Sequence, residues 1–281
     1  MLKNRILTAS ILAPLAILAI LLLPDLWFAL VWGIAIAVCA WEWSDLSGLA
    51  SVQARAAFTA VCVGLMTSYQ QWAGETEEWL AWPVIAFWLL FSALARKIPS
   101  KLVAFNYPPV ARMAVGLFVL VTAWILMVWT QHNLGPKQLL YLFLLVWLAD
   151  IAAYFTGKRF GLTKLAPDIS PGKTVEGLYG ALVAVALFAL LTAGGLYWAQ
   201  AGSFLEFSAT QVLDFVMLSV VTVFFSVVGD LFESLAKRVR GVKDSGAILP
   251  GHGGLLDRLD SLIAAVSVYY AGSKLLGVFF Q

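Results

Sequence analysis

Residues 211–240 read Q-V-L-D-F-V-M-L-S-V-V-T-V-F-F-S-V-V-G-D-L-F-E-S-L-A-K-R-V-R. The run up to residue 229 is almost purely apolar, and a run of about 18 apolar residues is long enough to cross a bilayer as a helix. It continues into two carboxylates and ends in a cluster of cations. We therefore predict a transmembrane helix at 211–236 whose last turns carry polar chemistry at the membrane surface.

The whole chain shares this apolar character. Of its 281 residues, 62% are hydrophobic and 12% are charged, whereas soluble domains carry about 25% charged residues. The apolar runs are too long and continuous for the strands of a β-barrel, so helices are expected to satisfy the backbone in lipid. We predict an all-α integral membrane protein, a polytopic bundle of about nine transmembrane helices at 5–23, 26–44, 56–72, 78–95, 112–131, 138–156, 174–198, 211–236 and 258–280.

The basic residues set the orientation of this bundle. If the N-terminus lies in the cytoplasm and nine spans alternate, only Lys137 and Lys274 of the 18 lysines and arginines fall on the outer side. Cytoplasmic loops carry an excess of such residues. We predict a cytoplasmic N-terminus and an outer C-terminus, in the inner or plasma membrane, with the active site facing the cytoplasm. The net charge of +2 averages a basic face and a mildly acidic one, and we expect no nucleic-acid partner.

Polar residues divide the chain into two regions. In residues 1–136 the apolar runs carry almost no ionisable side chains, Glu42 and Asp45 excepted. We predict a transmembrane scaffold of about five helices there, serving as a support, a lipid-facing surface or an oligomer contact. If that holds, Glu42 should matter little for activity. Residues 137–281 are predicted to form the catalytic region, about four helices with two cytoplasmic phosphate-binding loops.

Two helices of the second region carry paired carboxylates. Asp230 and Glu233 lie three residues apart and so share a helical face with Ser234 and Lys237, at i+4 and i+7. Two further carboxylates, again three apart, open the last span. Four carboxylates in one region repel one another unless a cation intervenes, and oxygen-only ligands favour Mg²⁺ or Mn²⁺ over zinc. The candidate metal ligands are therefore Asp230, Glu233, Asp257 and Asp260. The alternative is a packing ion pair, for example Asp230 with a lysine.

The loop between these helices is predicted to bind phosphate. Lys237, Arg238, Arg240 and Lys243 lie at the membrane surface, and glycines of residues 241–254 let backbone N–H groups approach an anion. The helix that follows directs its N-terminus to the same place. His252 is interpreted as a phosphate contact or a residue that fixes the loop. Positive-inside topology alone explains some of the cations, but not G-H-G-G placed against D-R-L-D.

A second anion site is predicted upstream, at S-P-G-K-T-V-E-G (170–177). We expect Ser170 and Pro171 to start a helix, with Lys173 and Thr174 in its first turn; an ordinary N-cap is the alternative. The full Walker A pattern is absent, so a P-loop is excluded. Further polar side chains are expected to complete a chamber open to the cytoplasm, namely Asp150 and Tyr154 at i and i+4, Lys158 one turn further, and Glu176.

These motifs resemble one family. The pattern S-x-x-K-R, four residues, K-D and then P-G-H-G-G-x-x-D-R-x-D runs from Ser234 to Asp260, and S-P-G-K-T-x-E-G and A-D-x-x-A-Y precede it. Together they resemble the signature of the phosphatidate cytidylyltransferases, or CDP-diacylglycerol synthases. The resemblance covers most of residues 149–261, and the N-terminal half matches only in being hydrophobic. Ala236 is a departure, since these enzymes more usually have a bulkier apolar residue there.

The resemblance implies a reaction in phospholipid biosynthesis: transfer of CMP from CTP to phosphatidic acid, giving CDP-diacylglycerol and pyrophosphate. It implies a divalent metal, Mg²⁺ or Mn²⁺, with room for a second cation, and a homodimer in the membrane lipid. Asp230 and Asp257 are the first choices for metal ligation, with Glu233 and Asp260 in support. The residues expected to be catalytic are Asp230, Asp257, Asp260, Lys237 and Lys243. Those expected to contact the phosphates of CTP or of the lipid are Ser170, Lys173, Thr174, Ser234, Lys237, Arg238, Lys243, His252 and Arg258.

Two other functions remain open from the sequence. One is a CTP-dependent kinase of a polyprenol or phytol, which would transfer the γ-phosphate and need a general base. The other is a transporter of a phosphorylated metabolite with Asp150 and Asp230 as coupling sites, although transporters tend to show two related halves and this chain does not. Release of pyrophosphate would distinguish the cytidylyltransferase from both.

Overall fold

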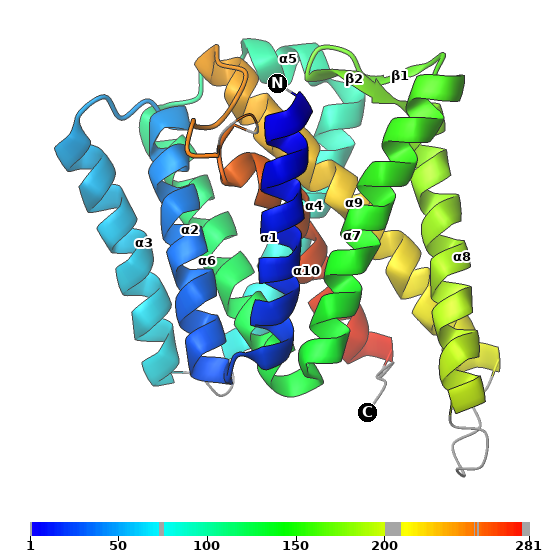
Figure 1. Ribbon diagram of the computed structural model, residues 1–281. Coiled ribbons are helices and arrows are strands. Elements are labelled where there is room, and N and C mark those ends of the chain that lie inside the picture. Colours follow the sequence, from blue (N-terminus) through cyan, green and yellow to red (C-terminus); the bar gives the residue numbers. More distant parts are fainter. Residues whose placement is uncertain (1, 73–75, 200–208, 250, 252, 277–281) are drawn as a thin grey trace.

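The computed structural model describes the chain except for residues 1, 73–75, 200–208, 250, 252 and 277–281 (Figure 1). Helices dominate these described residues, and one short antiparallel hairpin accompanies them. The elements are α1 (Leu2–Leu22), α2 (Asp25–Leu46), α3 (Val52–Trp72), α4 (Thr76–Lys97), α5 (Pro99–Ala104), α6 (Pro109–Leu134), α7 (Pro136–Phe160), β1 (Lys164–Ala166), β2 (Ser170–Thr174), α8 (Val175–Ala199), α9 (Ala209–Arg240) and α10 (Leu256–Leu276).

Six of these helices are long and apolar enough to cross a membrane, so the prediction of a helical integral membrane protein is confirmed. Within the described part of the chain they are α2, α4, α6, α7, α8 and α9. Helices α1, α3 and α10 have 21 residues each and lie alongside the six in the bundle (Figure 1).

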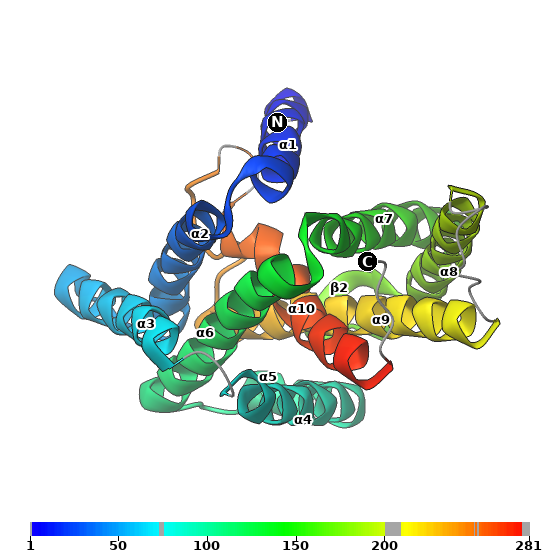
Figure 2. The ribbon, with the colours of Figure 1, turned by 90° about the horizontal axis from the view of Figure 1, so that it is seen from below.

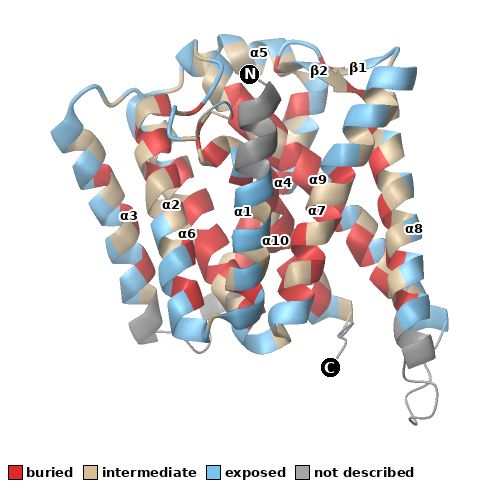
Figure 3. Cartoon of the chain, viewed as in Figure 1, coloured by how far each residue is buried: buried red, intermediate tan, exposed pale blue. Residues whose placement is uncertain are grey.

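Apolar side chains cover much of the outer surface of the bundle. Leu30 and Ile34 of α2 are exposed, as are Leu187 and Leu191 of α8. Buried residues concentrate instead along the inner faces of the helices (Figure 3). An apolar exterior of this extent would be unfavourable in water and is favourable against lipid chains. The distribution of side chains thus agrees with a protein embedded in a bilayer.

Helix α10 occupies the centre of the bundle, between α6 and α9 (Figure 2). Most of its side chains are buried, and it packs most extensively against α9. Gly229 makes this close approach possible: a Cβ at that position would lie 2.5 Å from the carbonyl oxygen of Asp260 and 2.8 Å from the Cβ of Ala264. The carboxylate-bearing turns of α9 (Asp230, Glu233) and the start of α10 (Asp257, Asp260) are therefore held side by side.

The segment 170–174 corrects one expectation from the sequence. It is not the start of a helix but strand β2, paired antiparallel with β1 so that Lys164 lies opposite Thr174. Pro171 and Gly172 both disfavour helix, which begins at Val175. The Thr174 side chain then caps α8, because its hydroxyl accepts a hydrogen bond from the backbone N–H of Gly177 (3.1 Å). The cap was the alternative interpretation of this segment, and it is present.

Candidate active site

A polar cavity of about 620 Å³ lies between α7, α8, α9, the start of α10 and the β1–β2 hairpin. It brings together the segments whose motifs the sequence singled out. Carboxylates and cations alternate on its wall, and hydroxyls accompany them. Its polar lining consists of Asp150, Tyr154, Lys158, Lys164, Lys173, Thr174, Asp230, Lys237, Asp244, Asp257, Arg258, Asp260 and Ser261.

Asp230 is held from two sides within this cavity. The Nζ atom of Lys173 lies 2.6 Å from its Oδ2 atom, and the hydroxyl of Ser234 donates to its Oδ1 atom at 3.2 Å. The ion pair that the sequence left as an alternative is thus present. Because Lys173 lies on β2 and Asp230 on α9, the pair also ties the hairpin to the helix bundle. Both side chains still line the cavity, so the pair lies within reach of a bound molecule.

Lys237 forms ion pairs with carboxylates of both α9 and α10. Its ammonium group forms ion pairs with Glu233, one turn earlier on α9, and with Asp257 of α10, whose Oδ1 atom is 2.5 Å away. Asp257 and Lys237 line the polar cavity, whereas Glu233 is buried behind it among apolar residues. A buried carboxylate needs such a partner, since an unpaired charge in the interior is costly. Glu233 therefore acts through Lys237 rather than on the cavity directly.

Asp257 also organises the loop that precedes α10. Its Oδ2 atom accepts hydrogen bonds from the backbone N–H of Ser245 (2.9 Å), the Ser245 hydroxyl (3.0 Å) and the backbone N–H of Gly254 (2.8 Å). With Lys237 on the other oxygen, the carboxylate is fully engaged by groups of the chain. Its position fixes where the loop runs beside the cavity at Ser245 and Gly254.

Glu42 of α2, in the N-terminal region, forms hydrogen bonds with this loop and with the start of α10. The side chain is only 1% exposed and accepts hydrogen bonds from the backbone N–H groups of Leu255 (3.0 Å) and Leu256 (2.8 Å). The Ser245 hydroxyl lies 3.0 Å from both Glu42 and Asp257, so the two carboxylates share its single proton. Glu42 therefore caps the N-terminus of α10, where a negative charge is favourable. This contact argues against the expectation that Glu42 should matter little.

The loop glycines pack around that carboxylate. A Cβ at Gly246 would lie 2.5 Å from the Oε1 atom of Glu42, and one at Gly254 would lie 2.5 Å from its Oε2 atom. The sequence had assigned these glycines to phosphate approach. In the structure their first role is to let the loop close over Glu42. The ionisable residue inside an apolar helix was the signal in the sequence that could have identified this contact.

The other predicted site residues lie outside the cavity lining. Arg238 donates from its Nε atom to the carbonyl of Ile169 (3.1 Å) and so holds the turn of the hairpin against α9. Lys243 is exposed on the loop, and Ser170 begins β2 without lining the cavity. His252 lies outside the described residues.

Glu176 has a structural contact rather than a place in the chamber. Its carboxylate accepts hydrogen bonds from the backbone N–H groups of Leu162 (3.1 Å) and Thr163 (3.1 Å), just before β1. It thereby anchors the first strand of the hairpin to the start of α8. Conversely, Lys164 and Asp244 line the cavity although neither was among the predicted site residues. The position of Lys164 depends on the hairpin, which was not predicted, whereas the K-D pair at residues 243–244 did point to Asp244.

The cavity offers oxygen ligands of the kind that a hard cation prefers. Among the described residues, no group of three or more His, Cys, Asp or Glu side chains is arranged as a metal site. Asp150, Asp230 and Asp260 nevertheless line one cavity, and carboxylate oxygens suit Mg²⁺ or Mn²⁺. Asp257 is the less available ligand, because its oxygens are engaged by the loop and by Lys237.

Fold and site together define a helical membrane protein whose polar cavity combines phosphate-binding cations with carboxylates. The chain belongs to the cytidylyltransferase family, whose model matches residues 3–276. It is 40% identical to a phosphatidate cytidylyltransferase of Pseudomonas aeruginosa, with 96% of each chain covered. It is 34% identical to that of Haemophilus influenzae (96% of this chain, 97% of the relative) and 30% identical to that of Thermotoga maritima (98% and 97%). The resemblance seen in the motifs is confirmed, and it extends through the N-terminal half.

Proposed function

We propose that this enzyme transfers CMP from CTP to phosphatidic acid, releasing pyrophosphate and forming CDP-diacylglycerol for phospholipid synthesis. The observation that carries the proposal is the cavity on α7–α10, where Lys158, Lys164, Lys173 and Arg258 lie beside three or more carboxylates. Cations of this kind suit the phosphates of CTP and of an anionic lipid. The family membership and the names of the relatives support the same reaction.

For this reaction the protein needs mainly to position the two substrates and to stabilise negative charge. A phosphatidate oxygen is already ionised and nucleophilic, so it can attack the α-phosphorus of CTP without a covalent enzyme intermediate or a general base. The attacking oxygen and the leaving pyrophosphate must lie in line on opposite sides of that phosphorus. Lys173 on the hairpin and Arg258 on α10 reach the cavity from different walls, so together they can orient phosphates and stabilise charge as it develops.

A divalent cation is part of the proposal. Asp230 and Asp260 would hold Mg²⁺ or Mn²⁺ from adjacent helices, with room for a second cation, while Asp257 and Glu233 would hold Lys237 in place beside them. When bound, the ion neutralises charge on the phosphates and assists departure of pyrophosphate. Asp230 pairs with Lys173, so the ion would share this carboxylate with the lysine.

The enzyme is proposed to have nine transmembrane helices and a cytoplasmic active site. The start of α1, helix α5, the hairpin and the loop before α10 all lie at one end of the bundle (Figure 1). Most lysines and arginines fall in segments that the alternating topology assigns to that end, which supports a cytoplasmic orientation. The homodimer is inferred from the family resemblance.

Labelled CTP tests the reaction. Purified enzyme is mixed with phosphatidic acid micelles and CTP carrying a label on the α- or the γ-phosphate, with and without Mg²⁺. We expect the α-label to enter the lipid and pyrophosphate to be released only with the metal. Transfer of the γ-label to an added polyprenol would indicate the kinase instead. Movement of neither label would refute both reactions and leave the transporter.

A further inference from the structure

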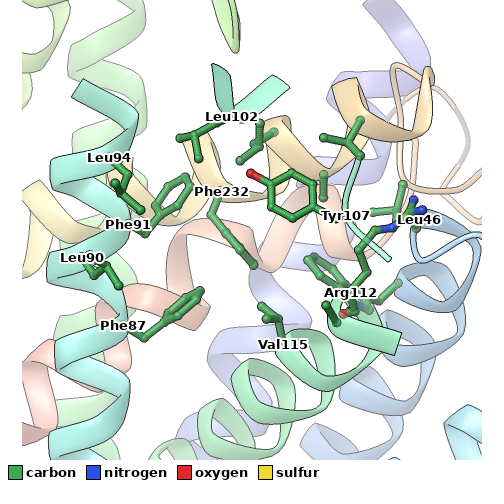
Figure 4. A pocket seen from close by; sticks show the side chains of 15 residues that line it. Leu46, Phe87, Leu90, Phe91, Leu94, Leu102, Tyr107, Arg112, Val115 and Phe232 are labelled. Atoms are coloured by element: carbon green, nitrogen blue, oxygen red, sulfur yellow. The ribbon is translucent and has the colours of Figure 1, made fainter. Parts of the chain in front are cut away.

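A second cavity lies on the opposite face of α9, and its lining is apolar. It has a volume of about 210 Å³ and is lined by residues of α2, α4, α5, α6 and α9 (Figure 4). Aromatic and aliphatic side chains form its walls, including Phe87, Phe91 and Leu94 of α4, Val115 of α6, and Phe232 and Ala236 of α9.

Helix α9 separates this cavity from the active site. Asp230 and Lys237 face the polar cavity, whereas Phe232 and Ala236 face the apolar one. A lipid whose phosphate lies among the carboxylates and lysines of the active site is therefore on the other side of the helix. We therefore consider for the apolar cavity a molecule other than the reacting phosphatidate.

Charge at one end of the cavity indicates the class of that molecule. Arg112 lies at its edge, although polar atoms form almost none of the cavity surface; one guanidinium nitrogen donates to the carbonyl of Leu46 (3.3 Å), and the Nε atom is buried. Within the described part of the chain, no carboxylate forms an ion pair with Arg112. A cation in such surroundings favours an anionic partner, and guanidinium matches phosphate well. Lys101, on the neighbouring α5, adds positive charge where lipid head groups are expected.

The shape of the cavity indicates an acyl chain. Its wall on α4 extends from Phe87 to Leu94, which corresponds to about 10 Å along the helix axis. Phe87 lies farther than Leu94 from the level of Tyr107 (Figure 4). The small side chain of Ala236 lines this space and leaves it open.

We propose that the cavity binds one acyl chain of an anionic phospholipid of the membrane, with the lipid phosphate at Arg112. This lipid is a second one, distinct from the phosphatidate that reacts. Its binding requires neither CTP nor metal, so its test is independent of the proposed reaction.

Photolabelling tests the site directly. The enzyme is reconstituted in phosphatidylcholine vesicles containing phosphatidylglycerol with a diazirine in one acyl chain, irradiated without CTP, and digested for mass spectrometry. We expect label on the cavity-facing segments of α4 and α9, displaced by unlabelled phosphatidylglycerol and not by added phosphatidylcholine. Ala236→Phe should abolish this labelling, whereas Leu30→Phe on the exposed face of α2 should leave it unchanged.

Head-group recognition is tested with arginine variants. Arg112→Gln should remove the preference for phosphatidylglycerol, and Arg112→Lys, which keeps the charge, should retain part of it. Arg96→Gln, an exposed neighbour at the end of α4, is the matched control. Equal displacement by phosphatidylcholine, or labelling that survives in Ala236→Phe, would overturn the proposal. A several-fold rise of KM for phosphatidate in Ala236→Phe would assign the cavity to the substrate and overturn it as well.

Discussion

Helix α9 separates two cavities of opposite chemistry. Asp230 and Lys237, seven residues apart, face the cavity of α7, α8 and α10, where ion pairs cross between elements. Phe232, Ala236 and Val239, at i, i+4 and i+7, face the apolar cavity beside α4 and α6. Two helical stripes of one segment thus face a polar cavity on one side and an apolar cavity on the other. The comparison predicts that substitutions on the polar side change catalysis, whereas those on the apolar side change lipid binding.

The largest effect is expected at Asp257. Asp257→Asn places an amide where one oxygen pairs with Lys237 and the other accepts three hydrogen bonds, so both the charge and part of the network are lost. We expect kcat to fall by at least about 10²-fold, since small misplacements at reacting groups cost this much. Asp214→Asn, near the opposite end of α9, should keep full activity. Size-exclusion chromatography in detergent should show that both variants are folded. Near-normal turnover of Asp257→Asn would show that this carboxylate is not needed for catalysis.

The Lys173–Asp230 pair offers a sharper test of what the polar cavity does. If the two side chains only hold the hairpin to α9, the double variant Lys173→Gln/Asp230→Asn should be no worse than either single variant. If each also contacts phosphate or metal, as we expect, the losses should add, with Lys173→Gln raising KM for CTP by about tenfold or more. The measurement is a double-mutant cycle on kcat/KM at several Mg²⁺ concentrations.

Glu42→Gln should give a smaller but clear loss, about tenfold in kcat. An amide in this position keeps one acceptor and turns a donor toward the N–H groups of Leu255 and Leu256. Hydrogen exchange should show faster opening of residues 241–249, and Asp25→Asn, exposed at the start of the same helix, is the control. Unchanged activity and exchange would return α2 to the role of scaffold.

The sequence predicted the class of fold and most of the residues that line the polar cavity, because both depend on patterns within short segments of the chain. Long apolar runs specify helices in lipid, and the carboxylates near the end of α9 and the start of α10 indicated that Asp230 and Asp260 lie in one region. The expected shared face fails for Glu233, which lies behind the cavity. What it missed depends on contacts between distant segments. Glu42 meets a loop more than 200 residues away, and Lys164 reaches the cavity only because β1 and β2 pair. No periodicity in the chain encodes either contact.

The smallest catalytic effect is expected at Ala236, and that makes it the most informative position for the comparison. Ala236→Phe adds a ring to the apolar cavity without touching the carboxylates or cations across α9, so kcat and KM for phosphatidate should stay within about twofold of the parent enzyme in detergent micelles. The same variant should lose photolabelling by phosphatidylglycerol. If catalysis instead fell as far as in Glu42→Gln, packing on the apolar face would set the geometry of Asp230 and Lys237. The two sides of α9 would then be one coupled unit, because a helix that carries both stripes cannot shift on one side without moving the other.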